Sequence, residues 1–424
     1  MGKTRAMTVS GYGEPIEEMV RSIRKWMTEM EEPPCSEDIL SKCEDVFFGS
    51  ELSYRTLPHE NEIIINSMHQ RLVYRYGILT GLLDDPGINE IMVNGPDRIY
   101  IEKERRLMRV DDAFTSASEL EEIIRMFASD VHREINEANP IVDARLPSGY
   151  RVNGVLRTVA LNGPILTIRK FREKEIEMSE LVGCASLTEE CARDLAALVK
   201  SGYNIFISGG TSSGKTTFLN ALTAFIGENE RVITIEDSAE LVISHIQNKV
   251  QMECRAANSI GKGEVSMTQL IRTSLRMRPD RIIVGEVRGK EVIDMIQAMN
   301  TGHDGSMSTG HGNSIKGMLN RLETMYLSDS RVSVSSVRNQ IANAIDIFVH
   351  LRRDAKGRRR VEEVAELTGF DGADYLINYL YRAGSDGVLI PTGSSLCDRE
   401  RLVRSGYGDM LLAPGGAGTG GSHD

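Results

Sequence analysis

The chain has 424 residues, enough for two or three domains, and its apolar (41%) and charged (26%) fractions are those of an ordinary globular protein. Its formal net charge is −11. The surface as a whole therefore repels nucleic acid, and no direct nucleic-acid partner is expected, although a local basic groove could still bind one. No C-x-x-C pair, no hydrophobic leader and no apolar run near ~18 residues is present. We therefore expect a cytoplasmic protein, peripheral to the inner face of the membrane, that acts there through a partner.

Residues 1–83 are expected to form an N-terminal helical region, with disorder over residues 1–13. From Ile16 to Met30 the apolar residues recur at helical spacing. The polar face of this helix carries both signs of charge, which favours docking on a protein over lying on a membrane surface. Further helices are expected over residues 36–48 and 60–83.

Residues 84–171 are expected to form a compact α+β domain. Strand-like alternation flanks the turn at residues 94–97, a helical pattern covers residues 117–131, and strand-like segments return after residue 150. This domain also carries a run of arginines, including Arg145, Arg151 and Arg169. They are either a solvated basic face or groups that close on a nucleotide bound elsewhere in the chain.

A charged linker is expected over residues 172–186, followed by a catalytic domain over residues 187–383. Strands and helices alternate there, which predicts a mostly parallel sheet covered on both faces. A hairpin is expected over residues 346–368. Residues 384–424 are rich in glycine and serine and are expected to form a flexible tail.

The central motif of the catalytic domain lies at residues 203–217. An apolar strand breaks at Gly209, a helix opens at Lys215, and the spacing fits the phosphate-binding loop pattern G-x-x-x-x-G-K-[ST]. Backbone N–H groups of such a loop surround a polyphosphate, while Lys215 reaches its β- and γ-phosphates and the Thr216 hydroxyl ligates Mg²⁺. The expected nucleotide-binding residues are Gly209, Gly210, Thr211, Ser212, Ser213, Gly214, Lys215, Thr216 and Thr217.

Three further stretches fall at the carboxyl ends of predicted strands, where open α/β sheets place their chemistry. The first carries Glu236 and Asp237, which could activate the attacking water or bind Mg²⁺. The second ends in Glu286, with Gly285 where an aspartate is usual, so Glu286 is free to orient the water. The third carries His311 between two glycines and predicts a sensor of the γ-phosphate. Whether Glu286 or Glu236 is the base stays open.

These motifs occur in the order phosphate loop, 235–237, 284–289 and 301–305. In that order they resemble the Walker A motif, Asp box, Walker B motif and His box of the type II/type IV secretion traffic ATPases. Residues 142–147 are similar to the CpaF-like branch, which assembles tight-adherence (Flp-type) pili, and so are residues 166–171. The resemblance covers about residues 75–370, with Gly312 standing where the family more often has alanine.

The resemblance implies a PAS-like N-terminal domain, a RecA-like P-loop NTPase domain and a homo-hexameric ring that hydrolyses Mg-ATP. It also implies a polytopic inner-membrane platform protein as partner, which the ring serves to move pilin or a secreted protein. Arg145 and Arg169 lie in the two best-matched stretches outside the catalytic domain and are carried over as nucleotide-contacting residues. The competing interpretations are a DNA-translocating ATPase of a conjugation system, a small-molecule kinase and a nucleotide-gated scaffold without turnover.

Overall fold

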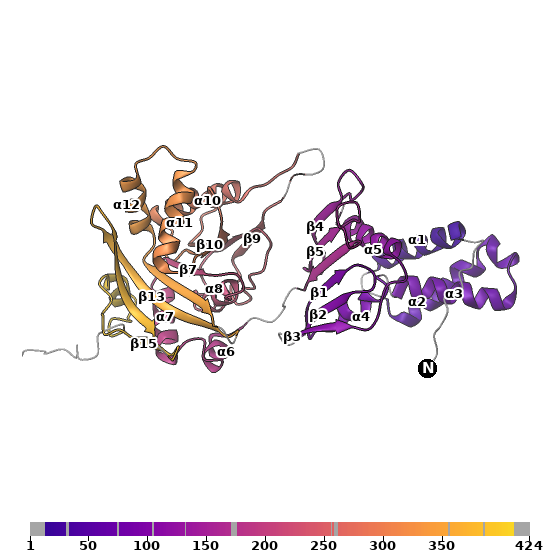
Figure 1. Cartoon of the computed structure of the whole chain (residues 1–424), viewed down its shortest axis with the longest axis horizontal. Coiled ribbons are helices and arrows are strands. Elements are labelled where there is room, and N and C mark those ends of the chain that lie inside the picture. Colours follow the sequence, from indigo (N-terminus) through magenta and orange to yellow (C-terminus); the bar gives the residue numbers. More distant parts are fainter. Residues whose placement is uncertain are drawn as a thin grey trace, which may run out of the picture. The chain divides into compact units, whose positions relative to one another are not determined.

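The computed structural model describes residues 13–30, 34–73, 76–103, 106–131, 133–170, 176–255, 257, 262–354, 357–384 and 386–410. The chain divides into two compact units, Met1–Phe171 and Arg172–Asp424 (Figure 1). No helix in those described ranges is long and apolar enough to cross a membrane. The disorder expected over residues 1–13 concerns residues outside the described part of the chain, except for Gly13, which begins a helix. The flexibility expected after residue 410 also concerns residues outside the described part.

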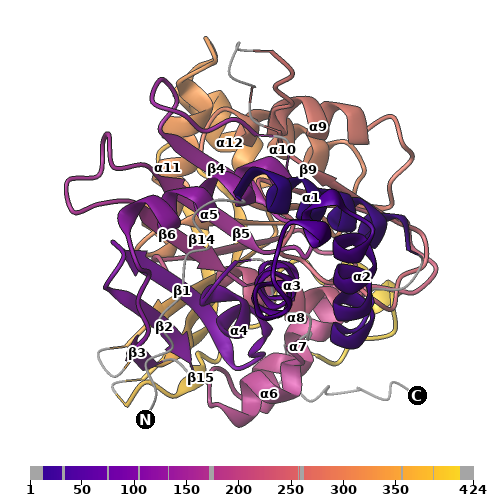
Figure 2. The ribbon, with the colours of Figure 1, turned by 90° about the vertical axis from the view of Figure 1, so that its right-hand side faces the viewer.

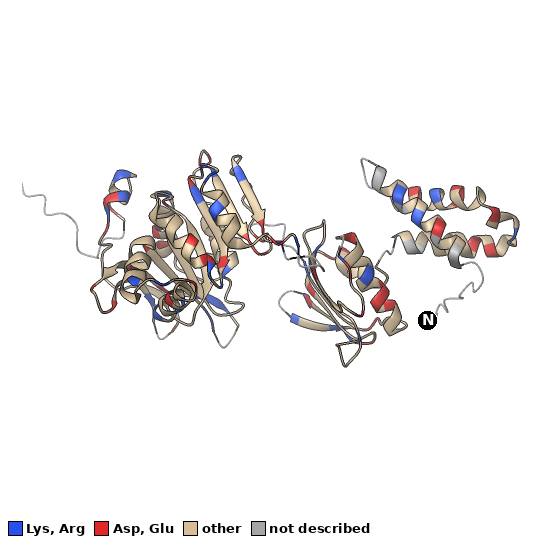
Figure 3. Ribbon diagram, turned by 90° about the horizontal axis from the view of Figure 1, so that it is seen from above, with Lys and Arg blue, Asp and Glu red and all other residues tan. Residues whose placement is uncertain are grey.

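The first elements are α1 (Gly13–Glu29), α2 (Ser36–Phe48), the short 3-10 helix η1 (Glu51–Tyr54) and α3 (Pro58–Val73). Figure 2 shows α1, α2 and α3 lying together, around a core in which Val20, Ile23, Phe47 and Met68 are fully buried. Residues of both signs of charge are interspersed along these helices (Figure 3). The apolar face of α1 is therefore covered by this chain's own helices, which corrects the expectation that it docks on another protein.

The helix expected over residues 60–83 is in fact two helices, α3 and α4 (Leu79–Asp84). Gly77 lies between them with φ +57°, a left-handed conformation that does not continue a helix. Leu79 and Leu83 pack into the core of the following domain rather than into that of the first helices. The N-terminal helical region therefore ends before residue 79, not at residue 83.

The α+β domain contains one antiparallel sheet in the order β3-β2-β1-β6-β5-β4. Its elements are β1 (Ile88–Asn94), β2 (Ile99–Lys103), β3 (Arg106–Val110), α5 (Ala117–Asp130), β4 (Ile141–Arg145), β5 (Arg151–Val155) and β6 (Ile165–Arg169). The apolar side of α5, which includes Leu120, Ile124 and Phe127, shares a core with Ile91, Val152 and other inward residues of the strands. The structure thus confirms the α+β class expected for this segment.

The second compact unit, Arg172–Asp424, contains the expected catalytic domain and is called the catalytic unit below. It is built on a nine-stranded sheet in the order β15-β14-β13-β12-β7-β11-β10-β8-β9. Its strands are β7 (Ile205–Gly209), β8 (Val232–Glu236), β9 (Lys249–Glu253), β10 (Arg281–Val287), β11 (Met307–His311), β12 (Ile347–Arg353), β13 (Arg359–Phe370), β14 (Tyr375–Ala383) and β15 (Leu389–Pro391). The neighbouring strands β12, β7, β11, β10, β8 and β9 all run parallel. Strands β13, β14 and β15 extend the sheet at one edge by antiparallel pairing.

Helices cover both faces of this sheet, and a separate apolar core lies under each layer. The helices are α6 (Met178–Gly183), α7 (Glu189–Lys200), α8 (Lys215–Thr223), α9 (Met267–Ser274), α10 (Glu291–Asn300), α11 (Ile315–Leu327), α12 (Val334–Ala344) and α13 (Glu400–Arg404). Strands β7 and β8 are buried along their whole length, as expected for central strands of a parallel sheet. The predicted mostly parallel α/β architecture is confirmed.

The end of the described chain is folded, which corrects the flexible tail expected from residue 384. Strand β15 pairs with β14, and Leu389, Leu396 and Leu402 are buried in the core of the catalytic unit. Arg401 forms an ion pair with Asp346 and lies over the Tyr203 ring, 4.3 Å from its centroid. Within the expected linker, α6 is likewise folded, with Met178 in the same core.

Candidate active site

The loop between β7 and α8 has the backbone that phosphate binding requires. Ser212 (φ +58°) and Gly214 (φ +94°) are both left-handed, which turns successive N–H groups toward one side of the loop. A Cβ on Gly209 would lie 2.5 Å from Ser213 Oγ and 2.6 Å from the Leu351 carbonyl oxygen. Gly209 is therefore required because a side chain has no room there, and Gly214 is favoured because its φ is positive.

Lys215 begins α8 and is buried, with 8% of its surface exposed. Its ammonium donates hydrogen bonds to the carbonyl oxygens of Gly209 and Gly210, both at 3.3 Å. Burial lowers the pKa of Lys215, and the nearby Glu286 carboxylate partly offsets that effect. The ammonium is thus held beside the loop, where a polyphosphate would pair with it.

Glu286 and His311 come from the neighbouring strands β10 and β11 and meet at Lys215. His311 Nε2 lies 2.9 Å from Glu286 Oε1, and Lys215 Nζ lies 3.8 Å from the same oxygen. The contact with His311 lacks hydrogen-bond alignment, so among the described residues this buried oxygen has no hydrogen-bond partner. It is therefore free to accept a hydrogen bond from a bound water.

The imidazole of His311 is expected to be neutral near pH 7. Burial lowers its pKa, the adjacent Lys215 ammonium lowers it further, and Glu286 opposes both. His311 Nδ1 lies 3.3 Å from Lys215 Nζ, so that nitrogen accepts from the ammonium and the ring proton is on Nε2. Gly312, next in the chain, has no room for the alanine that is more usual in the family, because a Cβ there would lie 2.9 Å from Met318 Cβ.

Arg288, which the sequence did not single out, connects two of the expected site residues. Its Nη2 lies 2.6 Å from Glu286 Oε2, and its Nη1 lies 3.2 Å from Asp237 Oδ2. One guanidinium therefore holds both carboxylates at the carboxyl ends of β8 and β10. Its position two residues after Glu286 was the available signal.

Glu236 has a different environment from that of Glu286. Its side chain is buried and accepts hydrogen bonds from the backbone N–H groups of Glu240 (2.9 Å) and Leu241 (3.1 Å). A Cβ on Gly285 would lie 2.9 Å from Glu236 Cγ, so the missing Walker B aspartate is explained by the space that Glu236 occupies. This geometry favours Glu286 as the base and gives Glu236 a role in shaping the loop after β8.

The expected Mg²⁺ ligands are oxygen donors on two different elements of the catalytic unit. Thr216 is the second residue of α8, and Asp237 directly follows β8. Among the described residues no group of three or more His, Cys, Asp or Glu side chains could hold a metal by itself. A hydroxyl, one carboxylate and nucleotide phosphates fit Mg²⁺, which usually binds through one or two carboxylates, substrate phosphates and water.

Arg145, Arg151 and Arg169 form one row across the sheet of the N-terminal unit. Arg151 is paired in register with Arg145 on β4 and with Arg169 on β6, so the three side chains share one face. Arg151 forms an ion pair with Asp143 at 3.1 Å, and Arg145 donates to the Gly149 carbonyl at 3.3 Å. Their contact with nucleotide stays a prediction.

A second histidine lies behind the phosphate-binding loop. His350 on β12 is 2% exposed, and its Nδ1 lies 2.9 Å from the hydroxyl of Ser208, the residue before Gly209. Its Nε2 lies 3.7 Å from Glu362 Oε2, with Arg352 and the Asn313 backbone also close enough to affect it. Burial lowers the pKa of His350 below its usual 6.5, and Glu362 only partly compensates.

We expect this histidine to make the protein less stable in mild acid. Below about pH 6.5 the unfolded chain binds a proton at His350 that the folded chain resists, so the free energy of unfolding falls as pH falls. The loss falls mainly between pH 7.5 and 5.5, where the imidazole of the unfolded chain takes up its proton. Urea unfolding of the wild type and of His350→Asn at both pH values measures it. The same pH dependence in both proteins would contradict the expectation.

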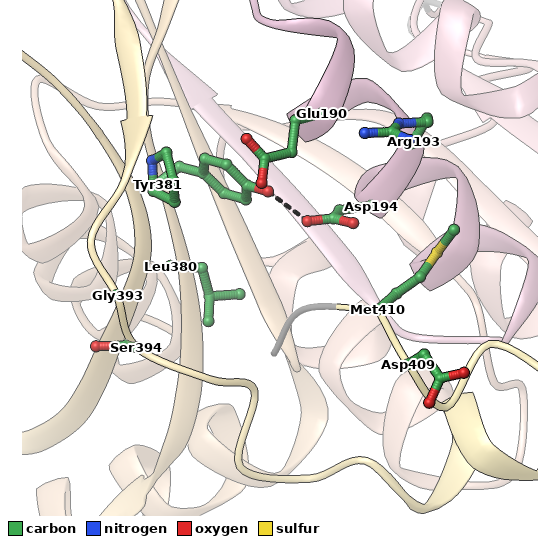
Figure 4. Close-up of a pocket in the computed structure, with 10 residues that line it drawn as sticks. Glu190, Arg193, Asp194, Leu380, Tyr381, Gly393, Ser394, Asp409 and Met410 are labelled. Carbon is green, nitrogen blue, oxygen red and sulfur yellow. Dashed lines mark hydrogen bonds between the residues drawn. The ribbon is translucent and has the colours of Figure 1, made fainter. Parts of the chain in front are cut away.

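A cavity of about 240 Å³ lies between α7, the β14–β15 edge and the last described residues (Figure 4). The Tyr381 hydroxyl donates to Asp194 there, and Glu190 and Asp409 also line the cavity. Burial raises the pKa of Asp194 and that of Tyr381, whose hydroxyl is held further by the hydrogen bond to Asp194. Of the described phosphate-loop residues, none lines this cavity, which is therefore distinct from the candidate active site.

Comparison with known sequences and structures identifies related proteins. A sequence profile of the family described as "Type II/IV secretion system protein" matches residues 75–374. A putative conjugal transfer protein of Mycobacterium tuberculosis is 34% identical over 302 residues, which is 70% of this chain and 85% of that protein. The conjugal transfer protein TrbB of Rhizobium radiobacter is 35% identical over 300 residues, covering 69% of this chain and 88% of TrbB.

Among solved structures, the pilus retraction motor PilT with bound ADP matches with a TM-score of 0.52. The match covers 77% of this chain and 86% of PilT at 19% sequence identity. At that identity the likeness supports the fold.

Proposed function

Because this chain belongs to the type II/IV secretion system protein family and is an ATPase, we propose that it is a traffic motor that hydrolyses Mg-ATP at the phosphate-binding loop. The observation that carries the proposal is the meeting of Glu286, His311 and Lys215 from three neighbouring elements beside that loop. A kinase of small molecules would need an acceptor pocket and a lid, for which the sequence offers no candidate. A scaffold without turnover would not need Glu286 and His311 in this arrangement.

The proposed roles of the site residues follow from their positions. Lys215 and the loop N–H groups bind the β- and γ-phosphates, and the free oxygen of Glu286 accepts a hydrogen bond from the attacking water and orients it. His311, kept neutral by burial and by the adjacent Lys215 ammonium, would donate from Nε2 toward the γ-phosphate. Thr216 and Asp237 would hold Mg²⁺, which when bound neutralises charge on the phosphate oxygens.

We further propose that the motor is a homo-hexameric ring on the cytoplasmic face of the membrane. It would act on a polytopic inner-membrane platform protein and so move pilin or a secreted protein. The arginine row of the N-terminal unit supports this, because Arg145 and Arg169 lie outside the catalytic unit and could complete the site only by closing on it. Belonging to a secretion family favours a large assembly as partner over a free small molecule.

Ring assembly is expected to make ATP hydrolysis depend on protein concentration. Specific activity of the full-length protein should rise with concentration in parallel with the mass measured by light scattering. The catalytic unit alone (residues 172–424) should bind ATP but turn it over slowly, because the arginine row is missing. Concentration-independent hydrolysis by a full-length monomer would contradict the ring proposal and leave the ATPase activity standing.

The second candidate is a DNA-translocating motor of a conjugation system. It is favoured by the conjugal transfer names of two relatives that this chain matches over most of their length. The net charge of −11 weighs against direct contact with DNA. Hydrolysis that single- or double-stranded DNA stimulates severalfold would favour this second candidate over protein movement.

A further inference from the structure

Arg359, the first residue of β13, lies against the phosphate-binding loop from outside the motif. Its Nε donates a hydrogen bond of 3.1 Å to the carbonyl oxygen of Ser212. Its Cδ lies 3.1 Å from the point where a Cβ on Gly214 would sit, with its Cβ and Cγ close behind. The side chain therefore runs along the two left-handed residues that give the loop its shape.

The backbone of the same residue is bonded to the end of the interdomain linker. The Ser186 hydroxyl donates to the Arg359 carbonyl oxygen at 2.8 Å, and the Val361 N–H donates to the Ser186 carbonyl oxygen, also at 2.8 Å. Ser186 follows Ala185, which is left-handed at φ +54°, and lies three residues before Glu189, the first residue of α7. One residue thus contacts the phosphate loop with its side chain and the linker with its main chain.

We propose that Arg359 is a positioning residue that couples the shape of the phosphate-binding loop to the linker. The inference rests on the proposed nucleotide site and adds to it a route by which nucleotide binding changes the conformation of the linker. The Arg359 guanidinium satisfies the carbonyl oxygen of the left-handed Ser212 with a hydrogen bond and so fixes the orientation of that peptide group. A change of the loop on phosphate binding then shifts the start of β13 and, through two hydrogen bonds, Ser186.

The first test measures nucleotide affinity. Arg359→Ala should weaken binding of ATP and of ADP equally, by on the order of tenfold, because the lost contact is to the loop and not to the γ-phosphate. Turnover at saturating ATP should stay within about twofold of wild type, which separates a binding effect from a catalytic one. Arg359→Lys keeps the charge but loses the Nε donor, so it should remain impaired.

Arg358→Ala is the matched control. Arg358 is the adjacent arginine, is largely exposed, and donates from Nε to Asp354 at 2.7 Å instead of contacting the loop. It should bind both nucleotides as the wild type does. Unchanged affinities in Arg359→Ala, or an equal loss in Arg358→Ala, would overturn the positioning role.

The second test follows the linker directly, by hydrogen exchange of the full-length protein with and without Mg-ADP. In the wild type, ADP should slow exchange in residues 209–217 and also in residues 180–190. In Arg359→Ala at saturating ADP, the slower exchange in residues 209–217 should persist, and the slower exchange in residues 180–190 should disappear. If that variant does not fold, Ser186→Ala, which removes only the hydroxyl bonded to Arg359, should give the same loss at residues 180–190.

The outcomes distinguish this inference from the function on which it rests. A variant that keeps the linker response while ADP is bound would overturn the coupling and leave the nucleotide site intact. A wild type that shows no ADP response in residues 209–217 would overturn both the nucleotide site and the coupling.

Discussion

Glu286→Gln is expected to bind ATP with near-normal affinity while its turnover falls by on the order of a hundredfold or more. The amide keeps the size of the side chain and can still approach Arg288, but it cannot take a proton from water. Of the two Glu286 oxygens, Oε1 lies 2.9 Å from His311 Nε2 and 3.8 Å from Lys215 Nζ and accepts no hydrogen bond from the described residues. The loss should therefore fall on the chemical step.

The measurement is steady-state phosphate release together with a nucleotide titration of the same preparation. Glu228→Gln makes the same chemical change at an exposed position of the catalytic unit and should leave both quantities unchanged. Near-normal hydrolysis by Glu286→Gln would move the role of base to Glu236, despite the two backbone hydrogen bonds that occupy the Glu236 carboxylate.

Lys215→Ala is expected to act earlier, on nucleotide binding itself. It removes a buried ammonium that already lies within hydrogen-bond distance of the loop carbonyls, and with it a charge that pairs with phosphate. A charge-assisted hydrogen bond of this kind corresponds to a roughly ten- to hundredfold weaker affinity for ATP. Hydrolysis should fall further, because the same ammonium neutralises charge in the transition state.

Isothermal titration with Mg-ATP measures this loss, with Lys316→Ala, an exposed lysine on α11, as the control. The free energy of unfolding should change little, since Glu286 keeps Arg288 as a partner when the lysine is removed. Wild-type affinity in Lys215→Ala would mean that the nucleotide does not bind at this loop.

The parts of the site that lie within one motif could be predicted from the sequence. A strand, a glycine-containing loop, Lys215 and a helix follow one another in the phosphate-binding motif. This order determines the local backbone, because the glycines allow the φ values that the loop needs and Lys215 begins the helix. Glu286 and His311 could be placed at strand ends by the apolar runs before them, and the structure brings both to Lys215. The parallel sheet followed in the same way from alternating strands and helices.

What could not be predicted depends on contacts between residues far apart in the chain. The bridge from Arg288 to Asp237 joins two strands, and the occupation of the space at Gly285 by Glu236 follows from packing. The folded end of the chain is held by pairing of β15 with β14 and by the ion pair of Arg401 with Asp346, contacts that a composition rich in glycine and serine after residue 383 did not reveal. The coupling residue Arg359 belongs to no motif at all.

The most direct test of the account is phosphate release from ATP by the full-length protein with Mg²⁺ and with EDTA, measured beside Glu286→Gln and Lys215→Ala. The account predicts Mg²⁺-dependent release by the wild type, near-background release with bound ATP in the first variant, and near-background release with weak binding in the second. Release by the wild type that EDTA does not reduce, or equal release by all three proteins, would contradict it.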